Sequence, residues 1–516
     1  MKDTRAITQV FDRFQRERVA FAGSVGDLAR HDANVEALRE AGAAALLHNL
    51  LSDPVVGVRC TAAGALGRLA TASASVATSL VADGAMAPLV KMLGAPRSDD
   101  AAKRREHAAQ RRAAATCLRG VAKHSAGDAR AVAEAGALRA AAACLESPDA
   151  ETKEAAAWLV DCVAAHAADL AEAAVAAGAL GPLVACLDCS EVAAKRTAAA
   201  ALGSVAQHGE GLARAVAAAG AVPALAAALA GGAQADVRLA RNVLCTLGQV
   251  AQGGGDLAGA MVAGGALPDV ARCLGAGDEL VQRYAAAALR DVARHGEELA
   301  GAVAATPGCL QALVACTAQG KGLNQCVAGG SHEGAVREAR RRAPAHAVPY
   351  IHASKAHSFD RASLGYAHTS ETLQAALEGR LSCASLPPPT NSAFLPGSLC
   401  PCRLPGIMAL GYLCSFTAPL AEAVIACGGL AALTAAVANG GAEPVQCAAA
   451  WALGQAGRHC AAHSQAVAES GALLALAGLE VAPQSSADLA SKCGRAAAAV
   501  VAQLAALPAL DALLRM

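Results

Sequence analysis

Aromatic residues are scarce in this chain, at 2% of its 516 residues. An excess of charge is missing as well, because Lys and Arg together number 43 and so do Asp and Glu, which makes the formal net charge zero. A chain without net positive charge lacks the overall attraction that draws a protein to the phosphate backbone of nucleic acids. We therefore expect no nucleic-acid partner, and any electrostatic contact must be local.

A long apolar segment is also absent. The opening residues MKDTRAITQVF carry charges early and lack the apolar core of a signal peptide, and the apolar stretch 496–514 is interrupted by Gln503, Pro508 and Asp511. We expect a soluble, cytoplasmic protein with no membrane partner. The sequence contains no P-loop, HExxH or GxSxG motif, so we expect neither enzyme activity nor a cofactor.

Hydrophobic residues nevertheless reach 55%, and the excess is alanine, which is small and strongly helix-forming. A glycine followed by a small residue and an apolar run recurs at Gly42, Gly84, Gly136, Gly178, Gly220, Gly265, Gly308, Gly429 and Gly471. Successive spacings are 42, 52, 42, 42, 45, 43, 121 and 42 residues. A period near 42 residues is typical of armadillo and HEAT arrays, in which helical units stack.

Three helices are predicted in each unit. The glycine suits the left-handed residue after a first helix, and a proline soon after it, as at Pro88 and Pro182, suits the first turn of a second helix. A longer third helix follows, as in VRCTAAGALGRLA from Val58, with apolar residues on one stripe. Because HEAT units have two helices, we predict an all-α fold, a right-handed armadillo-repeat superhelix or α-solenoid.

Two spacings are longer than the period. The 52-residue step holds ten extra residues around SDDAAKRREH, which predict a longer exposed loop or a helix extension. The 121-residue step covers 321–402, where His, Pro, Ser and Arg replace the alanine background, and such a segment buries too little apolar surface to order. We predict N-terminal repeats in 1–320, a long disordered insertion in 321–402, either a translated intron or a lineage-specific loop, and C-terminal repeats in 403–516.

Basic residues recur at two adjacent positions in the first turns of the third helices. Third helices line the concave face of such solenoids, so these residues predict a ladder along it. They either form a solvated stripe paired with local acids such as Glu154 and Asp236, or line a groove for an acidic protein segment. We call this set the basic row: Arg59, Arg111, Arg112, Lys153, Lys195, Arg196, Arg241 and Arg283.

Histidine recurs near the end of the third helix, at His31, His124, His166, His208, His295 and His459. These side chains are expected to cap carbonyl groups at the negative end of the helix. Equivalent residues lie about 10 Å apart in packed helices, which is too far to share a metal ion. Cys186 and Cys189 form a CxxC pair without a second pair, so no metal site is predicted.

Two further residue types have a packing explanation. Cysteines at one register, Cys144, Cys186, Cys273 and Cys316, indicate reduced, buried thiols. The two tryptophans, Trp158 and Trp451, share a position in the third helix, where they either pack in the core or form a contact surface.

Three segments of the chain resemble one family of armadillo proteins. With RAITQVFDRFQRERVAF near the start, RLPGIMALGY from Arg403 and the helix ends AKHS, AAHA and AQHG, the chain resembles the sperm-associated antigen 6 family. The resemblance implies a non-catalytic scaffold of the central apparatus of motile cilia and flagella, attached to a microtubule of the central pair. It implies location in the axoneme, microtubule or central-apparatus partners and no cofactor.

Two other armadillo functions compete with this one. A nuclear import adaptor binds basic signals with a Trp and an Asn four residues later, whereas here Trp158 is followed at that spacing by Cys162 and Trp451 by Gln455. An adhesion or vacuolar scaffold is the other, and the repeats alone do not separate it from an axonemal one.

Overall fold

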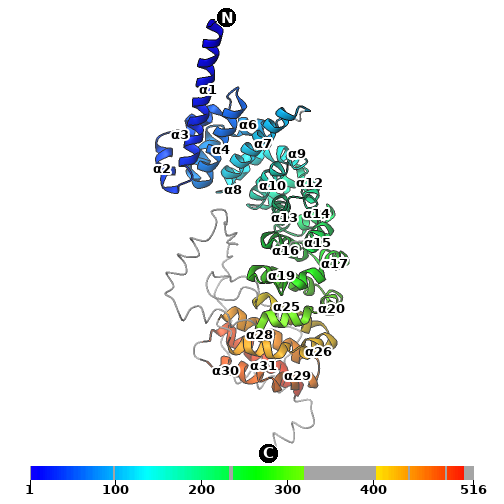
Figure 1. The fold of residues 1–516 in the computed structure, drawn as a ribbon. Coiled ribbons are helices and arrows are strands. Elements are labelled where there is room, and N and C mark those ends of the chain that lie inside the picture. Colours follow the sequence, from blue (N-terminus) through cyan, green and yellow to red (C-terminus); the bar gives the residue numbers. More distant parts are fainter. Residues whose placement is uncertain are drawn as a thin grey trace, which may run out of the picture. The chain divides into compact units, whose positions relative to one another are not determined.

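A computed structural model of the chain describes residues 2–96, 99–231, 236–318, 403–439, 442–482 and 485–504. The predicted insertion 321–402 lies outside the described residues. The described part of the chain is helical and contains no strand (Figure 1). It divides into two compact units, Met1–Ala266 and Leu267–Met516, which we describe separately as unit 1 and unit 2.

The helices follow the predicted three-helix repeat. First helices are α2 (Asp32–Glu40), α5 (Ala74–Ala82), α8 (Ala126–Glu134), α11 (Ala168–Ala176), α14 (Glu210–Ala218), α17 (Gly255–Ala263), α20 (Glu297–Ala305), α26 (Ala418–Ala426) and α29 (Ala461–Glu469). Second helices are α3 (Ala43–Leu50), α6 (Met86–Leu93), α9 (Ala137–Leu145), α12 (Leu180–Cys186), α15 (Ala221–Ala230), α18 (Leu267–Cys273), α21 (Cys309–Ala318), α27 (Gly429–Ala438) and α30 (Ala472–Glu480).

Third helices are longer, and they pack side by side within unit 1 and within unit 2. In unit 1 they are α1 (Lys2–Leu28), α4 (Val56–Ala72), α7 (Ala101–Ala122), α10 (Ala150–Ala164), α13 (Val192–Ala206) and α16 (Val237–Gln252), each in contact with the next. In unit 2 they are α19 (Glu279–Ala293), α25 (Arg403–Phe416), α28 (Glu443–Gly457) and α31 (Ala487–Leu504), again in contact in that order. Three helices per period of about 42 residues make this an α-solenoid of armadillo type.

The repeat glycines have the predicted conformation, with one correction. Between first and second helices, nine of the described glycines have φ values from 69° to 88°, the left-handed region that ends a helix. In the repeat that contains α26 and α27 this residue is Gly428, at φ 79°, whereas we predicted Gly429, which is the first residue of α27. Two consecutive glycines make the sequence ambiguous there.

Of the ten extra residues of the 52-residue step, those from Ala101 to His107 form a helix extension. They lengthen α7 to 22 residues, and the carboxylate of Asp100 caps its start by accepting hydrogen bonds from the backbone N–H groups of Ala102 (2.7 Å) and Lys103 (3.1 Å). Of the two alternatives from sequence, the extension is therefore the one found.

In unit 2 the helices before residue 319 pack directly against the helix that begins at Arg403. Helix α25, which follows this segment in the chain, packs directly against α19 and α21, as a third helix packs in the other repeats. The repeat made of α20, α21 and α25 is therefore complete in the described residues.

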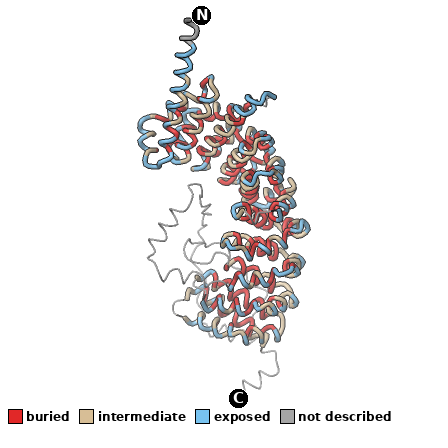
Figure 2. Tube along the Cα trace, in the orientation of Figure 1, coloured by how far each residue is buried: buried red, intermediate tan, exposed pale blue. Residues whose placement is uncertain are grey.

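Alanine, valine and leucine side chains make up most of the core between the helix layers, and Figure 2 marks the buried residues along the helices. Neighbouring third helices approach closely at glycines: a Cβ atom on Gly67 would lie 3.0 Å from the Cα atom of Cys117. A Cβ atom on Gly203 would lie 2.6 Å from the Oγ1 atom of Thr246. At these two positions the neighbouring helices leave no room for a larger side chain.

Candidate protein-binding surface

In unit 1 the structure places five members of the basic row within the first five residues of their third helices: Arg59, Lys153, Lys195, Arg196 and Arg241. The predicted first-turn position is wrong for Arg111 and Arg112, which are the eleventh and twelfth residues of α7 because this helix is extended at its start. Arg283, the eighth, belongs to α19 in unit 2, where its guanidinium lies 5.9 Å from the ring centre of Tyr284. All eight side chains are half-buried instead of fully exposed. Their contacts divide the seven into different roles.

Two arginines of the basic row hold the connection between the second and third helices. Arg59 donates hydrogen bonds to the backbone carbonyls of Asp53 (2.6 Å) and Pro54 (3.1 Å) and to the side chain of Gln110 (3.0 Å). Arg111 donates to the carbonyl of Ala95 through Nε (3.1 Å) and Nη2 (2.5 Å). These guanidinium groups satisfy carbonyls that a helix end leaves without partners, so their role here is structural.

Two more arginines form ion pairs with the start of the next third helix. Arg112 on α7 lies 3.3 Å from the carboxylate of Asp149 and also pairs with Glu151. Arg196 on α13 lies 3.8 Å from the carboxylate of Asp236. Pairs this exposed contribute about 0–1 kcal/mol each. The pairing with local acids that the sequence offered as one alternative is therefore present at these two positions.

The two lysines of the row are different. Lys153 on α10 and Lys195 on α13 occupy equivalent positions of neighbouring third helices, and in the described part of the chain no carboxylate lies within 4.0 Å of either ammonium group. Arg241, on the next third helix α16, is half-buried. The ammonium groups of these two lysines can therefore pair with the carboxylates of an acidic partner.

Arg18 is a member of this register that the sequence analysis missed. It precedes the central apolar residue of α1 by the same seven positions as Arg59, Arg111, Lys153 and Lys195 do in their helices. Its guanidinium pairs with the carboxylate of Asp53 and lies 4.4 Å from the ring centre of Phe14. The signal was the register, which continues into α1 once this helix is recognised as a third helix.

The recurring histidines join neighbouring repeats. The Nε2 atoms of His124, His166 and His208 lie 2.6, 2.7 and 2.7 Å from the backbone carbonyls of Ala70, Ala122 and Ala164. In unit 2, Nε2 of His459 lies 2.6 Å from the carbonyl of Cys414. Carbonyl capping is confirmed for these four histidines, and each carbonyl belongs to the preceding third helix, so each of these imidazoles links two repeats. His31 differs, because it is exposed and lies just before α2.

One carboxylate is buried inside the layer of third helices. Asp161 on α10 is 7% exposed and takes the register that Gly67 and Gly203 take in their helices. The Oγ atom of Ser204 donates a hydrogen bond of 2.6 Å to its Oδ1 atom. Burial raises the pKa of Asp161 from 3.8 to about 6, while the hydrogen bond from Ser204 and the charge of Arg119 act in the opposite direction.

The two tryptophans have different surroundings. Trp451 is 6% exposed and lies edge-on to Tyr412, with ring centres 5.1 Å apart, so the core reading is confirmed for it. Trp158 is half-buried, and the guanidinium of Arg119 lies 4.2 Å from its ring centre. Neither is followed by the asparagine of an import-adaptor groove, and Gln455, four residues after Trp451, is 1% exposed.

Cysteines behave as packing residues. Cys144, Cys186, Cys273 and Cys316 are between 1% and 3% exposed, as predicted. The CxxC pair is not arranged as a joint site, because the Sγ atom of Cys186 donates to the carbonyl of Leu145 (3.7 Å) and that of Cys189 to the carbonyl of Glu191 (3.4 Å).

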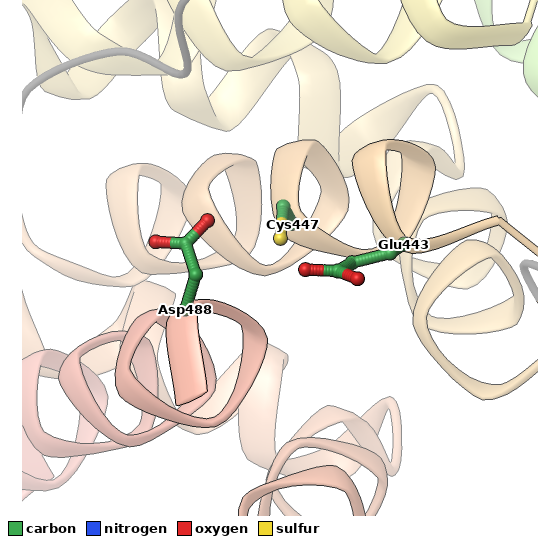
Figure 3. A group of neighbouring side chains, drawn as sticks. All are labelled: Glu443, Cys447 and Asp488. Carbon is green, nitrogen blue, oxygen red and sulfur yellow. The ribbon is translucent and has the colours of Figure 1, made fainter. Parts of the chain in front are cut away.

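Three side chains of unit 2 come close enough to suggest a metal site. Glu443 and Cys447 on α28 and Asp488 on α31 have their oxygen and sulfur atoms within 4.8 Å of one another (Figure 3). The carboxylates already have partners: Ser486 donates to Glu443, and the ammonium of Lys492 lies 2.6 Å from Asp488. Burial raises the pKa of the Cys447 thiol to about 11, against the opposing charge of Lys492. A metal ion would have to displace the ammonium and a tightly held proton.

A helix can cross a bilayer only if it is both long and apolar enough. In the described residues no single helix is both long and apolar enough to cross a bilayer, and five pairs of short helices, bent by 71° to 90° where they join, pass this test only when each pair is counted as one.

Known proteins resemble this chain in sequence over a short segment and in fold over almost all of it. It is 42% identical over 77 residues to human sperm-associated antigen 6, which is 15% of this chain and 15% of that protein. It is 39% identical over 89 residues to the mouse protein, or 17% and 18% of the two chains. No family model matches the sequence. A crystal structure of an engineered protein superposes with a TM-score of 0.69 at 19% identity, covering 94% of this chain and 98% of that one, a likeness of fold.

Proposed function

We propose that the chain is a non-catalytic scaffold that binds partner proteins along the edge formed by the first turns of its third helices. The observation that carries this proposal is the pair Lys153 and Lys195, which stand on neighbouring helices without an acidic partner in the described residues. Stacked repeats form an extended surface suited to a long peptide, and two ammonium groups in a row favour one that carries carboxylates.

We further propose that this scaffold works in the axoneme of motile cilia or flagella, within the central apparatus and with microtubule-associated partners. Support comes from the 42% identity to human sperm-associated antigen 6 over 77 residues. The segments RAITQVFDRFQRERVAF and RLPGIMALGY support it through their resemblance to the same family. A nuclear import adaptor is less favoured, because Trp451 is buried and the groove amide is missing after both tryptophans.

Localisation of a tagged full-length chain in a flagellated cell tests the axonemal proposal. We expect the tag along the flagellum, retained after the membrane is removed by detergent, because a central-apparatus scaffold stays bound to the cytoskeleton. A signal confined to the nucleus or to cell junctions would contradict the axonemal proposal and leave the scaffold proposal to be tested by binding.

A further inference from the structure

Helix α1 is a third helix whose own first and second helices are missing from the described residues. Its Val25 stands at the central apolar position of a third helix, and Gly26 follows it as Gly67 follows Leu66 in α4. A Cβ atom on Gly26 would lie 3.3 Å from the Cβ atom of Ala65, the close approach that neighbouring third helices make elsewhere. Helix α1 packs against α4 and α2, both of which follow it in the chain.

The consequence is an open core face. Three residues after the central position, α1 has Leu28, which is 49% exposed. The residues at this position in six other third helices are 0% exposed: Leu69, Val121, Val163, Val205, Val250 and Val292. Four residues before the central position, Phe21 is 40% exposed, whereas its counterparts Ala62, Ala114, Ala156, Ala198 and Ala285 are 0% exposed.

The same face carries further large apolar residues. Val10 is 69% exposed and Phe14 is 54% exposed, and with Phe21 and Leu28 they follow one another at intervals of four, seven and seven residues. That spacing puts all four on one stripe of an α-helix. Figure 2 shows exposed residues along much of the free length of α1. In a chain with six phenylalanines, an exposed stripe with two of them requires a covering partner.

The other repeats show what covers such a face. In each of them the second helix packs on the third helix of the same repeat, as α3 does on α4, α9 on α10 and α27 on α28. The shape that fits α1 is therefore a single amphipathic helix in the position of the missing second helix.

The carboxylate of Glu17 limits what can pack on the apolar stripe of α1. Glu17 is exposed and lies three residues after Phe14 and four before Phe21, in the middle of the stripe. If two copies of α1 paired in parallel, two Glu17 carboxylates would meet, and if they paired antiparallel, each would face apolar side chains. Both arrangements bury an unpaired charge, which costs several kcal/mol. A helix with a cation at its centre avoids this cost.

We propose that the open face of α1 binds an amphipathic helix of a partner protein, with an apolar stripe interrupted by one central Lys or Arg. The stripe packs on Val10, Phe14, Phe21 and Leu28, and the cation pairs with Glu17. None of the eight residues of the basic row belongs to this stripe, and the two surfaces adjoin at Arg18, whose guanidinium lies 4.4 Å from the ring centre of Phe14.

Two synthetic peptides of about 18 residues test the proposal against the full-length chain by fluorescence anisotropy. Both carry the same leucine stripe at helical spacing, one with Lys and one with Glu at its centre. We expect the Lys peptide to bind at least about fivefold more tightly, and Glu17→Lys to reverse the preference, because an opposite charge replaces a like one. Phe14→Ser should weaken the Lys peptide by about tenfold or more, whereas Leu474→Ser, at a residue 82% exposed on α30, should not.

Circular dichroism of each variant, with helix content unchanged, confirms that lost binding is not lost folding. The proposal is overturned if neither peptide binds, or if Glu17→Lys leaves the preference unchanged. Light scattering that shows a dimer of the chain dissociating on Phe14→Ser would assign the face to a second copy. Binding of the chain to anionic lipid vesicles that is lost in the same variant would assign it to a membrane surface, and both outcomes overturn the proposal.

Discussion

At the scale of single residues, the third-helix layer contains one group that folding leaves in an unfavourable state. Asp161 is buried at a register where Gly67 and Gly203 stand in their helices, and its pKa rises from 3.8 to about 6. A carboxyl group with a raised pKa in the folded state stabilises the fold below its unfolded pKa, and this contribution is lost as the pH rises through about 6. The difference in the free energy of unfolding amounts to about 2–3 kcal/mol between pH 4 and pH 8.

Asp161→Asn should therefore stabilise unit 1 at pH 8 and change it little at pH 4. The amide keeps an acceptor for the hydroxyl of Ser204 and removes the buried charge. We expect a gain of about 2–3 kcal/mol in the free energy of unfolding at pH 8. It is measured as the rise in the thermal unfolding midpoint of the variant over that of the wild-type chain, which should be larger at pH 8 than at pH 4. Asp188→Asn, at an exposed position, is the control. A gain that is equal at both pH values would contradict the role assigned to burial.

The histidines give a second test at this scale. His208→Ala removes the hydrogen bond from its imidazole to the carbonyl of Ala164 and should cost about 1 kcal/mol. Faster amide hydrogen exchange should appear in α10 and α13, on both sides of the lost bond. His31→Ala, at an exposed histidine, should leave exchange unchanged, and equal effects of the two substitutions would show that the bond does not couple repeats.

At the scale of helices, sequence reasoning found the period and the order of helices but not the contacts of their polar side chains. Alanine content, glycine spacing and prolines determine where helices begin and end, because these are local properties of the chain. The role of Arg111 is not local: its partner, the carbonyl of Ala95, lies 16 residues earlier and becomes reachable only when α6 folds back on α7. The open face of α1 was missed for the same reason, since the exposure of Phe21 and Leu28 depends on how the other described helices pack around α1.

The repeat that contains α20, α21 and α25 allows a test at this scale. Replacing residues 319–402 with a Gly–Ser linker of about six residues should leave the thermal unfolding of unit 2 unchanged or raise it, because α25 already packs against α19 and α21. Other repeats join these helices with a few residues, as between Leu145 and Ala150. A shorter loop costs less closure entropy, by about 2 kcal/mol here. Loss of cooperative unfolding in α25–α31 would show that the segment contributes to the fold.

At the scale of the whole molecule, we propose two binding surfaces on one chain of stacked repeats. In this proposal the first turns of the third helices bind an acidic segment through Lys153 and Lys195, and the apolar face of α1 binds a helix. Each repeat contacts its neighbours, so substitutions on one surface should leave the other intact. A scaffold needs this independence, because it must hold two partners at once.

Co-sedimentation of the full-length chain with microtubules, with purified tubulin as the only other protein, tests the central claim most directly. We expect the wild-type chain to pellet with microtubules at low ionic strength and less at high ionic strength, as charge pairing is screened. The double variant Lys153→Glu and Lys195→Glu should bind about tenfold more weakly, or about 1.4 kcal/mol, while Lys91→Glu, at an exposed lysine on α6, should bind as the wild type does. Binding of the double variant equal to that of the wild type would contradict the claim that this edge is the binding surface.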